Sequence, residues 1–221
     1  RFALDPSAVD AVMFQEWGSR DEERGWLADG IEDTIARSLD GWWGSAVFAE
    51  WGYERNERLE LKIPSHRYCD EEHTRRGAWR GAFMALGIIH GFENSWGPWM
   101  LLEEDQHGLV YLQHVRRFFT SVVPFAELRR APEVLTAGEW APGERPLALA
   151  TEDGRQVAVY LPVGGQVALS PPHPLVEYRA RWFDPVRGDL HPAVAADAVF
   201  CAPEATRKGH PQDWVLVLEM E

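Results

Sequence analysis

Short apolar runs alternate with helical patterns from the start of the chain to about Pro124. The apolar runs predict strands at residues 12–15, 45–50 and 87–90, and the helical patterns predict helices at 21–39, 71–86 and 108–121. In the middle helix, Trp79, Phe83 and Leu86 recur at i, i+4 and i+7, the spacing of one helix face. A strand–helix order repeated three times is typical of parallel α/β units.

After Pro124 the pattern changes to strand-like runs separated by Gly and Pro. Asp153-Gly154 lies between alternating runs, which is a strong hairpin signal. Residues 176–183 alternate apolar with charged side chains and predict a half-buried strand. Further runs at 198–201 and 214–218 bring the expected total to about six or seven strands. Successive strands without helices predict an antiparallel sandwich.

These two patterns predict two domains, residues 1–123 and 124–221. The first would supply three strands, or four at most, whereas a (β/α) barrel closes with eight. We therefore predict an α/β plus all-β chain, in which the C-terminal half of a TIM barrel is followed by an antiparallel β-sandwich. On this count the first half of the barrel is missing from the chain.

Composition excludes several classes of partner. The 221 residues are 45% hydrophobic, enough for a packed core, and their formal net charge is −13. Such a surface repels nucleic-acid backbones and anionic lipids, so we expect neither nucleic acid nor membrane as a partner. No apolar run approaches the roughly 20 residues of a membrane span.

The cysteines and histidines give no metal-site pattern. Cys69 and Cys201 are far apart, and neither has a CxxC partner. His66 and His73 flank Cys69 and three acidic residues, but their spacing matches no standard ligand set. We expect no metal and no cofactor.

The candidate chemistry centres on Glu50, which follows the apolar run Ala46–Ala49 directly. Barrel enzymes place catalytic groups at the C-terminal tips of buried strands. A carboxylate that attacks or deprotonates a substrate needs such a rigid mount. The same position also suits a helix N-cap or a solvated turn residue.

Several stretches share motifs with one known arrangement of domains. In the first part these are residues 49–54 (AEWGYE), 75–79 followed by 85–87, and His90-Gly91 with Trp96; in the second they are residues 160–165, 180–185 and 213–218. The first set resembles the C-terminal half of the apiosidase-like glycoside hydrolases, clan A barrels of the DUF4038 type. The second resembles the small β-sandwich, labelled collagen-binding, that closes such chains. The likeness covers nearly the whole chain and is more specific in the sandwich.

The resemblance implies roles for individual residues. Glu50 would be the nucleophile of a retaining glycosidase at the end of barrel strand seven. Tyr53 and Glu54 would contact or support a carbohydrate substrate, and Gln15 would line the site from strand six, together with Ser19. The chain departs from the family at Ala49 and Trp51, where Gly or Pro is usual, in the turn after strand six, and at His90, where tyrosine is expected.

A glycosidase needs a second carboxyl group, about 5–5.5 Å from the first in retaining enzymes and about 6.5–9.5 Å in inverting ones. The resemblance places it after strand four, which this chain does not contain. Within the chain, position favours Glu16, which is otherwise a solvated or substrate-contacting residue. We therefore expect an N-terminal half-barrel, chain or segment, as partner. Without it the chain should be inactive and its sheet edges exposed.

Aromatic residues supply the remaining candidates. Eight of the eleven tryptophans precede residue 100. Flat rings stack on sugars but also fill cores, and we predict binding for Trp17, Trp51 and Trp96 and core positions for Trp79 and Trp182. His90 either polarises a substrate hydroxyl or is structural. Two rival functions stay open: a catalytically silent carbohydrate-binding or scaffold protein, and a different hydrolase with Glu50 as general base.

Overall fold

The computed structural model describes residues 10–15, 31–54 (apart from 41 and 43), 70–92 and 107–220 (apart from 137 and 142). It mixes helices with parallel and antiparallel sheets and separates into two compact units. The first unit comprises Arg1–Ala82 and Leu86–Leu109, and the second comprises Phe83–Ala85 and Val110–Glu221. The domain division predicted between residues 123 and 124 stays a prediction.

The first unit contains a three-stranded parallel sheet. Its strands are β1 (Ala11–Phe14), β2 (Ser45–Ala49) and β3 (Gly87–Ile89), in the order β1-β2-β3. The register places Met13 beside Val47 and Val47 beside Gly87. All three strands lie where the apolar runs predicted them.

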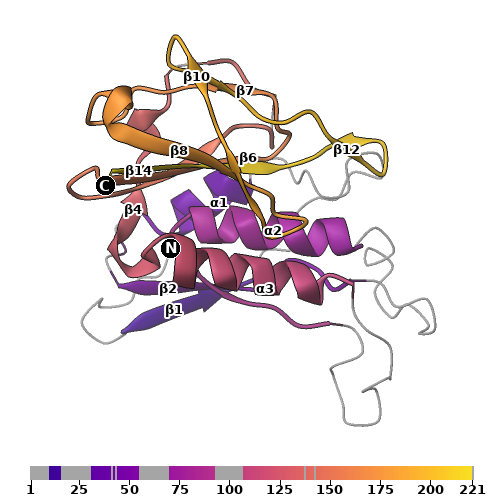
Figure 1. Ribbon diagram of the computed structural model, residues 1–221. Helices are drawn as coiled ribbons and strands as arrows, with labels where there is room; N and C mark the ends of the chain where they lie inside the picture. The colour runs from indigo at the N-terminus through magenta and orange to yellow at the C-terminus, as the bar shows by residue number, and fades with distance from the viewer. Residues whose placement is uncertain are drawn as a thin grey trace. The chain divides into compact units, whose positions relative to one another are not determined.

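Helices α1 (Ile31–Ser38) and α2 (Glu71–Phe83) belong to the same unit and are shown in Figure 1. Local contacts and backbone geometry explain both ends of α2. The Oδ1 atom of Asp70 accepts the N–H of His73 at 3.1 Å, an N-cap contact, and Ala85 leaves the helix at a positive φ of 61°. The Arg80 guanidinium donates to Glu32 at 2.9 Å and so joins the two helices.

The two faces of the parallel sheet differ. On one face, Phe48 and Ile88 pack against α2 at Gly81, where an added Cβ would lie 2.7 and 2.8 Å from them. On the other face, Met13 is 67% exposed and Ile89 is 56% exposed. Within the described residues, helix packing therefore covers one face and leaves apolar side chains on the other face in contact with solvent.

The second unit contains a six-stranded antiparallel sheet in the order β4-β5-β6-β14-β8-β9. Beside it are a three-stranded sheet, β10-β11-β7, and the hairpin β12-β13. The strand bounds are β4 Leu128–Arg130, β5 Leu147–Thr151, β6 Gln156–Leu161, β7 Gln166–Ala168, β8 Tyr178–Phe183, β9 Leu190–Pro192, β10 Ala195–Ala196, β11 Val199–Cys201, β12 Thr206–Arg207, β13 His210–Pro211 and β14 Trp214–Met220. The Asp153-Gly154 turn joins β5 to β6 as predicted, with Gly154 at a φ of 70°.

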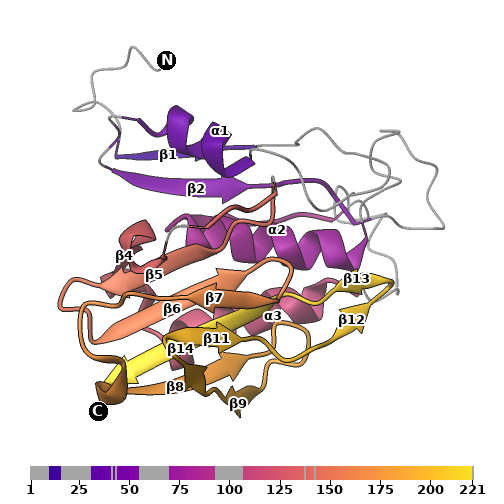
Figure 2. The same ribbon diagram turned by 90° about the horizontal axis from the view of Figure 1, so that it is seen from above.

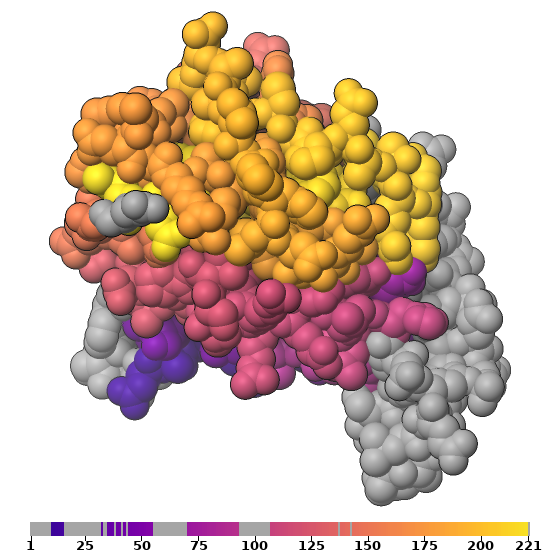
Figure 3. All heavy atoms as spheres, in the orientation of Figure 1, coloured from indigo at the N-terminus to yellow at the C-terminus, as the bar shows by residue number. Residues whose placement is uncertain are grey.

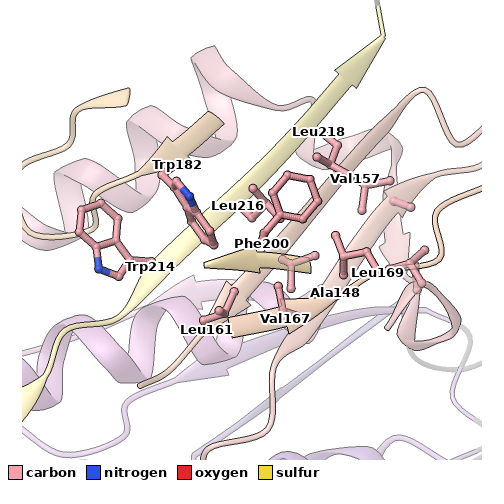
Figure 4. Packing of buried hydrophobic residues seen from close by; sticks show 14 of the residues in the cluster. Ala148, Val157, Leu161, Val167, Leu169, Trp182, Phe200, Trp214, Leu216 and Leu218 are labelled. Atoms are coloured by element: carbon pink, nitrogen blue, oxygen red, sulfur yellow. The ribbon is translucent and has the colours of Figure 1, made fainter. Parts of the chain in front are cut away.

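The small sheet is stacked on the large one, as Figures 1 and 2 show. Side chains from both sheets form the core between them. Figure 4 shows Leu216 and Trp182 of the large sheet close to Phe200 of the small one, and all three are at most 2% exposed. This arrangement confirms a β-sandwich, with Trp182 in its core.

The opposite face of the large sheet is also buried, against helix α3 (Leu109–Arg117) and the π-helical turn Phe118–Val122. The ring of Phe118 lies 5.0 Å from that of Phe183. Phe83, the last residue of α2, belongs to the second unit, and its ring lies 5.7 Å from that of Tyr160. Figure 3 shows α3 and the following segment in pink beside the orange and yellow strands. Burial on both faces explains why β14 reads as a continuous apolar run.

Three details differ from the sequence predictions. The helix predicted at 71–86 ends at Phe83, and Ala85 beyond it has a positive φ. The strand predicted from Val176 begins at Tyr178, because Leu175–Glu177 forms a 3-10 turn that leaves Val176 91% exposed. The described part of the second unit also has more strands than the six or seven expected, since strands of two or three residues are too short to show periodicity. Among the described residues, no helix has the length and apolar character needed to span a membrane.

We predict that Leu216→Ala lowers the free energy of unfolding by about 2–5 kcal/mol, because it leaves a cavity in the sandwich core. Val176→Ala is the matched control and should change the free energy by less than about 0.5 kcal/mol, since Val176 is 91% exposed. Urea unfolding of both variants measures the difference. Equal losses for the two variants would contradict the assigned core.

Candidate active site

Three of the predicted site residues follow the three parallel strands directly. Gln15 comes after β1, Glu50 after β2 and His90 after β3. The Glu50 N–H donates to the carbonyl of Ile89 at 3.0 Å, which extends the β2–β3 ladder by one hydrogen bond. The carboxyl edge of this sheet therefore carries an amide, a carboxylate and an imidazole on neighbouring strands.

The Glu50 carboxylate is partly buried and oriented by Gln15. Nε2 of Gln15 donates to Oε2 of Glu50 at 2.5 Å, a hydrogen bond to a charged acceptor and therefore a strong one. A Cβ placed on Gly91 would lie 3.4 Å from Oε1 of Glu50, so the glycine leaves space beside the second oxygen. One carboxylate oxygen is held by Gln15, and the other borders Gly91.

The backbone at Glu50 is strained. Its φ is 66°, in the left-handed region that non-glycine residues rarely occupy, and such a conformation costs about 1–3 kcal/mol. Gly52 follows at a φ of 117°, where the absence of a side chain removes the same penalty. Surrounding contacts must therefore hold Glu50 in place, as is common at functional sites.

An aromatic layer lies behind Glu50. The ring of Trp51 stacks on His90 at 4.1 Å and on Phe48 at 5.2 Å, while Tyr53 and Phe92 meet His90 edge-on. Trp51 is 2% exposed and Tyr53 is 3% exposed. The structure thus places both predicted substrate contacts inside the packing, where they support the site and have almost no surface for a ligand.

His90 is a neutral member of this layer. Burial, reinforced by nearby His73, lowers the pKa of His90 to about 3. Both of its ring nitrogens are buried, and neither has a hydrogen-bond partner in the described part of the chain. At neutral pH the imidazole therefore acts as an uncharged aromatic plate.

Glu54 accepts hydrogen bonds inside the first unit, from Gly108 and Thr74. One of its oxygens accepts the N–H of Gly108 at 2.8 Å and the hydroxyl of Thr74 at 3.4 Å, and the side chain is 4% exposed. Burial raises the pKa of Glu54, while the Gly108 hydrogen bond partly offsets that rise. Gly108 is required there, since an added Cβ would lie 2.3 Å from the Glu54 oxygen.

The remaining predicted site residues, Glu16, Trp17, Ser19 and Trp96, lie outside the described residues. Among the residues that are described, no group of three or more His, Cys, Asp or Glu side chains is arranged to hold a metal ion. The sequence reasoning missed two contributors from α2. His73 donates from Nε2 to the carbonyl of Trp51 at 2.8 Å, and Gly77 receives the Trp51 ring. A glycine inside a predicted helix was the available signal for Gly77.

Comparisons with known proteins identify the fold. Residues 135–219 match the family model described as "Putative collagen-binding domain of a collagenase". A crystal structure of a glycoside hydrolase family 5 protein from Bacteroides vulgatus superposes with a TM-score of 0.74 at 18% identity, covering 100% of this chain and 52% of that one. A second structure, named as a glycoside hydrolase, gives 0.66 at 16% identity over 96% and 53% of the two chains. No curated protein sequence matches the chain.

The chain therefore spans about half the length of these two solved structures and shares their fold over nearly all of its own length.

We predict that stability falls as the pH is lowered from 6.5 toward 3, because His90 protonates in the unfolded state but stays neutral when folded. The free energy of unfolding should change by up to about 1.4 kcal/mol per pH unit from this group. His90→Phe keeps an aromatic plate without a titrating nitrogen and should remove this slope. Urea unfolding at a series of pH values measures it.

Glu54→Gln is the control with the opposite sign. The raised pKa of Glu54 contributes stability that is present at low pH and lost as the pH rises through the folded-state value. In Glu54→Gln the free energy of unfolding should no longer fall as the pH rises through the folded-state pKa of Glu54. Its decrease between pH 6.5 and 3, which we assign to His90, should be unchanged. If His90→Phe lost stability between pH 6.5 and 3 as steeply as the parent, His90 would not be the group responsible.

Proposed function

We propose that this chain forms part of a retaining glycoside hydrolase that cleaves a terminal glycosidic bond, with Glu50 as the nucleophile. The observation that carries the proposal is the Glu50 carboxylate, fixed by Gln15 on strained backbone at the carboxyl end of the middle strand. The fold shared with two glycoside hydrolase structures supports the reaction class. A carbohydrate is then the substrate.

The chemistry needs two carboxyl groups. An oxygen of Glu50 attacks the anomeric carbon while the bond to the leaving oxygen breaks, and a second carboxyl group protonates that oxygen. Water then attacks the glycosyl–Glu50 ester and gives its proton to the second carboxylate, so that Glu50 is released and the anomeric configuration is retained. The hydrogen bond from Gln15 fixes the position of the attacking group.

The loop after β2 carries another carboxyl group, Glu54, but Thr74 and Gly108 occupy it inside the fold. We therefore propose that an N-terminal half-barrel, in the same polypeptide or a second one, supplies the acid/base. The open face at Met13 and Ile89 supports this proposal, as does coverage of only 52% and 53% of the two related structures. In this proposal the three strands are the last three of a (β/α) barrel.

A second candidate is a catalytically silent carbohydrate-binding or scaffold protein. The observation favouring it is the match of residues 135–219 to a family model whose description is a binding domain. In the glycosidase proposal, the sandwich serves as a structural cap. The two candidates differ in whether any form of the protein turns over a glycoside.

Glu50→Gln should reduce turnover of aryl glycosides by at least about 10⁴-fold, because the amide cannot form the ester intermediate. Glu50→Gly should be equally inactive but at least as stable as the parent, since glycine adopts a φ of 66° without strain. Turnover and urea unfolding measure the two effects. Glu152→Gln, at an exposed position of the sandwich, is the control and should retain activity.

Retained turnover in Glu50→Gln would refute the nucleophile. An inactive parent in every form would favour the silent binding protein.

The purified chain alone should self-associate or unfold without a cooperative transition in its first unit. Apolar residues on the open face promote aggregation, and so do the outer edges of β1 and β3, which pair with no strand among the described residues. Adding the N-terminal half should give a stable 1:1 complex. Light scattering and hydrogen exchange at β1–β3 measure these outcomes. A 25.1 kDa monomer with protection in β1–β3 equal to that in β14 would contradict the proposal.

A further inference from the structure

We propose that helix α2 positions the nucleophile. Gly77 packs against the ring of Trp51, His73 donates a hydrogen bond to its carbonyl, and these two contacts hold Glu50 in its left-handed conformation. This inference rests on the proposed function of Glu50. Both residues are argued to act on Glu50 through their contacts with Trp51, so both are positioning residues. Their role is to keep the strained backbone of Glu50, with its φ of 66°, from relaxing.

Gly77 and Gly81 lie four residues apart, which places them on one face of α2. A Cβ on Gly77 would lie 2.1 Å from both Cδ1 and Nε1 of Trp51, and a Cβ on Gly81 would lie 2.7 Å from Cδ1 of Phe48. Each glycine costs about 1 kcal/mol relative to alanine inside a helix. The two glycines therefore form a groove that receives two aromatic residues of the β2 segment, on either side of Glu50 in the sequence.

The Trp51 ring is fixed by more than the groove. It stacks on Phe48 at 5.2 Å with an interplanar angle of 25°, and on His90 at 4.1 Å with an angle of 20°. Only 2% of the residue is exposed. A ring with these contacts cannot rotate with the backbone, so the position of residue 51 relative to α2 is set.

His73 fixes the backbone of Trp51 as well. Its Nε2 lies 2.8 Å from the Trp51 carbonyl oxygen, and because a carbonyl only accepts, Nε2 must carry the hydrogen. The backbone N–H of His73 is in turn bonded to Oδ1 of Asp70, the residue that caps α2. The first turn of the helix thus holds the peptide between Trp51 and Gly52, one peptide beyond the one that follows Glu50.

On the other side of residue 50, the ladder is equally fixed. The Glu50 N–H donates to the Ile89 carbonyl at 3.0 Å, so the peptide before Glu50 belongs to the sheet. The Ala49–Glu50 peptide is held by β3, and the Trp51–Gly52 peptide is held by α2. The φ and ψ angles of Glu50 and Trp51 therefore have to connect two fixed groups, and the packed ring of Trp51 restricts the angles of Trp51. A relaxed conformation at Glu50 would require the chain to break the hydrogen bond to the Ile89 carbonyl, to break the hydrogen bond from His73, or to move the packed Trp51.

The test uses Gly77→Ala, with Leu216→Ala as a destabilising control, in the complete, active form of the protein. Gly77→Ala displaces Trp51 and should lower kcat about 10- to 100-fold with KM unchanged, because a displacement of about 1 Å can cost that much. Leu216→Ala removes packing from the sandwich core of the second unit and should lower stability while kcat is retained. Equal kcat losses in the two variants would overturn the proposal.

His73 supplies a rescue experiment. His73→Leu removes the hydrogen bond to the Trp51 carbonyl and should lower kcat, whereas His73→Gln can place an amide N–H near the position of Nε2 and should recover most of it. Full activity in His73→Leu, or no recovery in His73→Gln, would overturn the role of His73.

Crystal structures of Gly77→Ala and His73→Leu test the geometry without reference to catalysis. The proposal expects Glu50 to leave positive φ or the Gln15–Glu50 hydrogen bond to break. Unchanged φ and an unchanged 2.5 Å contact would overturn it even if the parent hydrolyses glycosides. Absence of turnover in the parent would instead overturn the proposed function, and these structures would still decide the positioning.

Discussion

The left-handed backbone at Glu50 is the constraint around which the first unit is arranged. A φ of 66° is unfavourable for glutamate. In our proposal it persists because the Ala49–Glu50 peptide is bonded to β3 and the Trp51–Gly52 peptide is bonded to α2. The conformation turns the carboxylate toward Gln15 on the neighbouring strand. Stability and site geometry are therefore opposed at this residue, as is typical where strain serves function.

Small residues make this arrangement possible. Gly77 and Gly81 let aromatic rings approach the α2 backbone, Gly91 leaves space beside a Glu50 oxygen, and Gly108 lets Glu54 reach a backbone N–H. The second unit does not depend on these contacts. Its large sheet is buried on both faces, by the small sheet on one and by α3 on the other, which gives it a core of its own.

Periodicity was sufficient to predict the elements that position the site. Residues 12–15, 45–50 and 87–90 became β1, β2 and β3, and the spacing of Trp79 and Phe83 located α2, although Leu86 lies beyond the end of that helix. Strand ends then placed Gln15, Glu50 and His90 on one edge. Periodicity could not predict the turn after Glu50, because a positive φ at a glutamate is imposed by tertiary contacts. For the same reason, the burial of Trp51 and Tyr53 was not readable from their position after a strand.

Trapping of a covalent intermediate would identify the nucleophile directly. A 2-deoxy-2-fluoro glycoside with a good leaving group slows hydrolysis of the ester intermediate, and peptide mass spectrometry then locates the modified residue. If Glu50 is the nucleophile, a single glycosyl adduct will form on Glu50 in the active form of the protein and none in Glu50→Gln. An adduct on a different carboxylate, or turnover of the substrate without any adduct at Glu50, would contradict it.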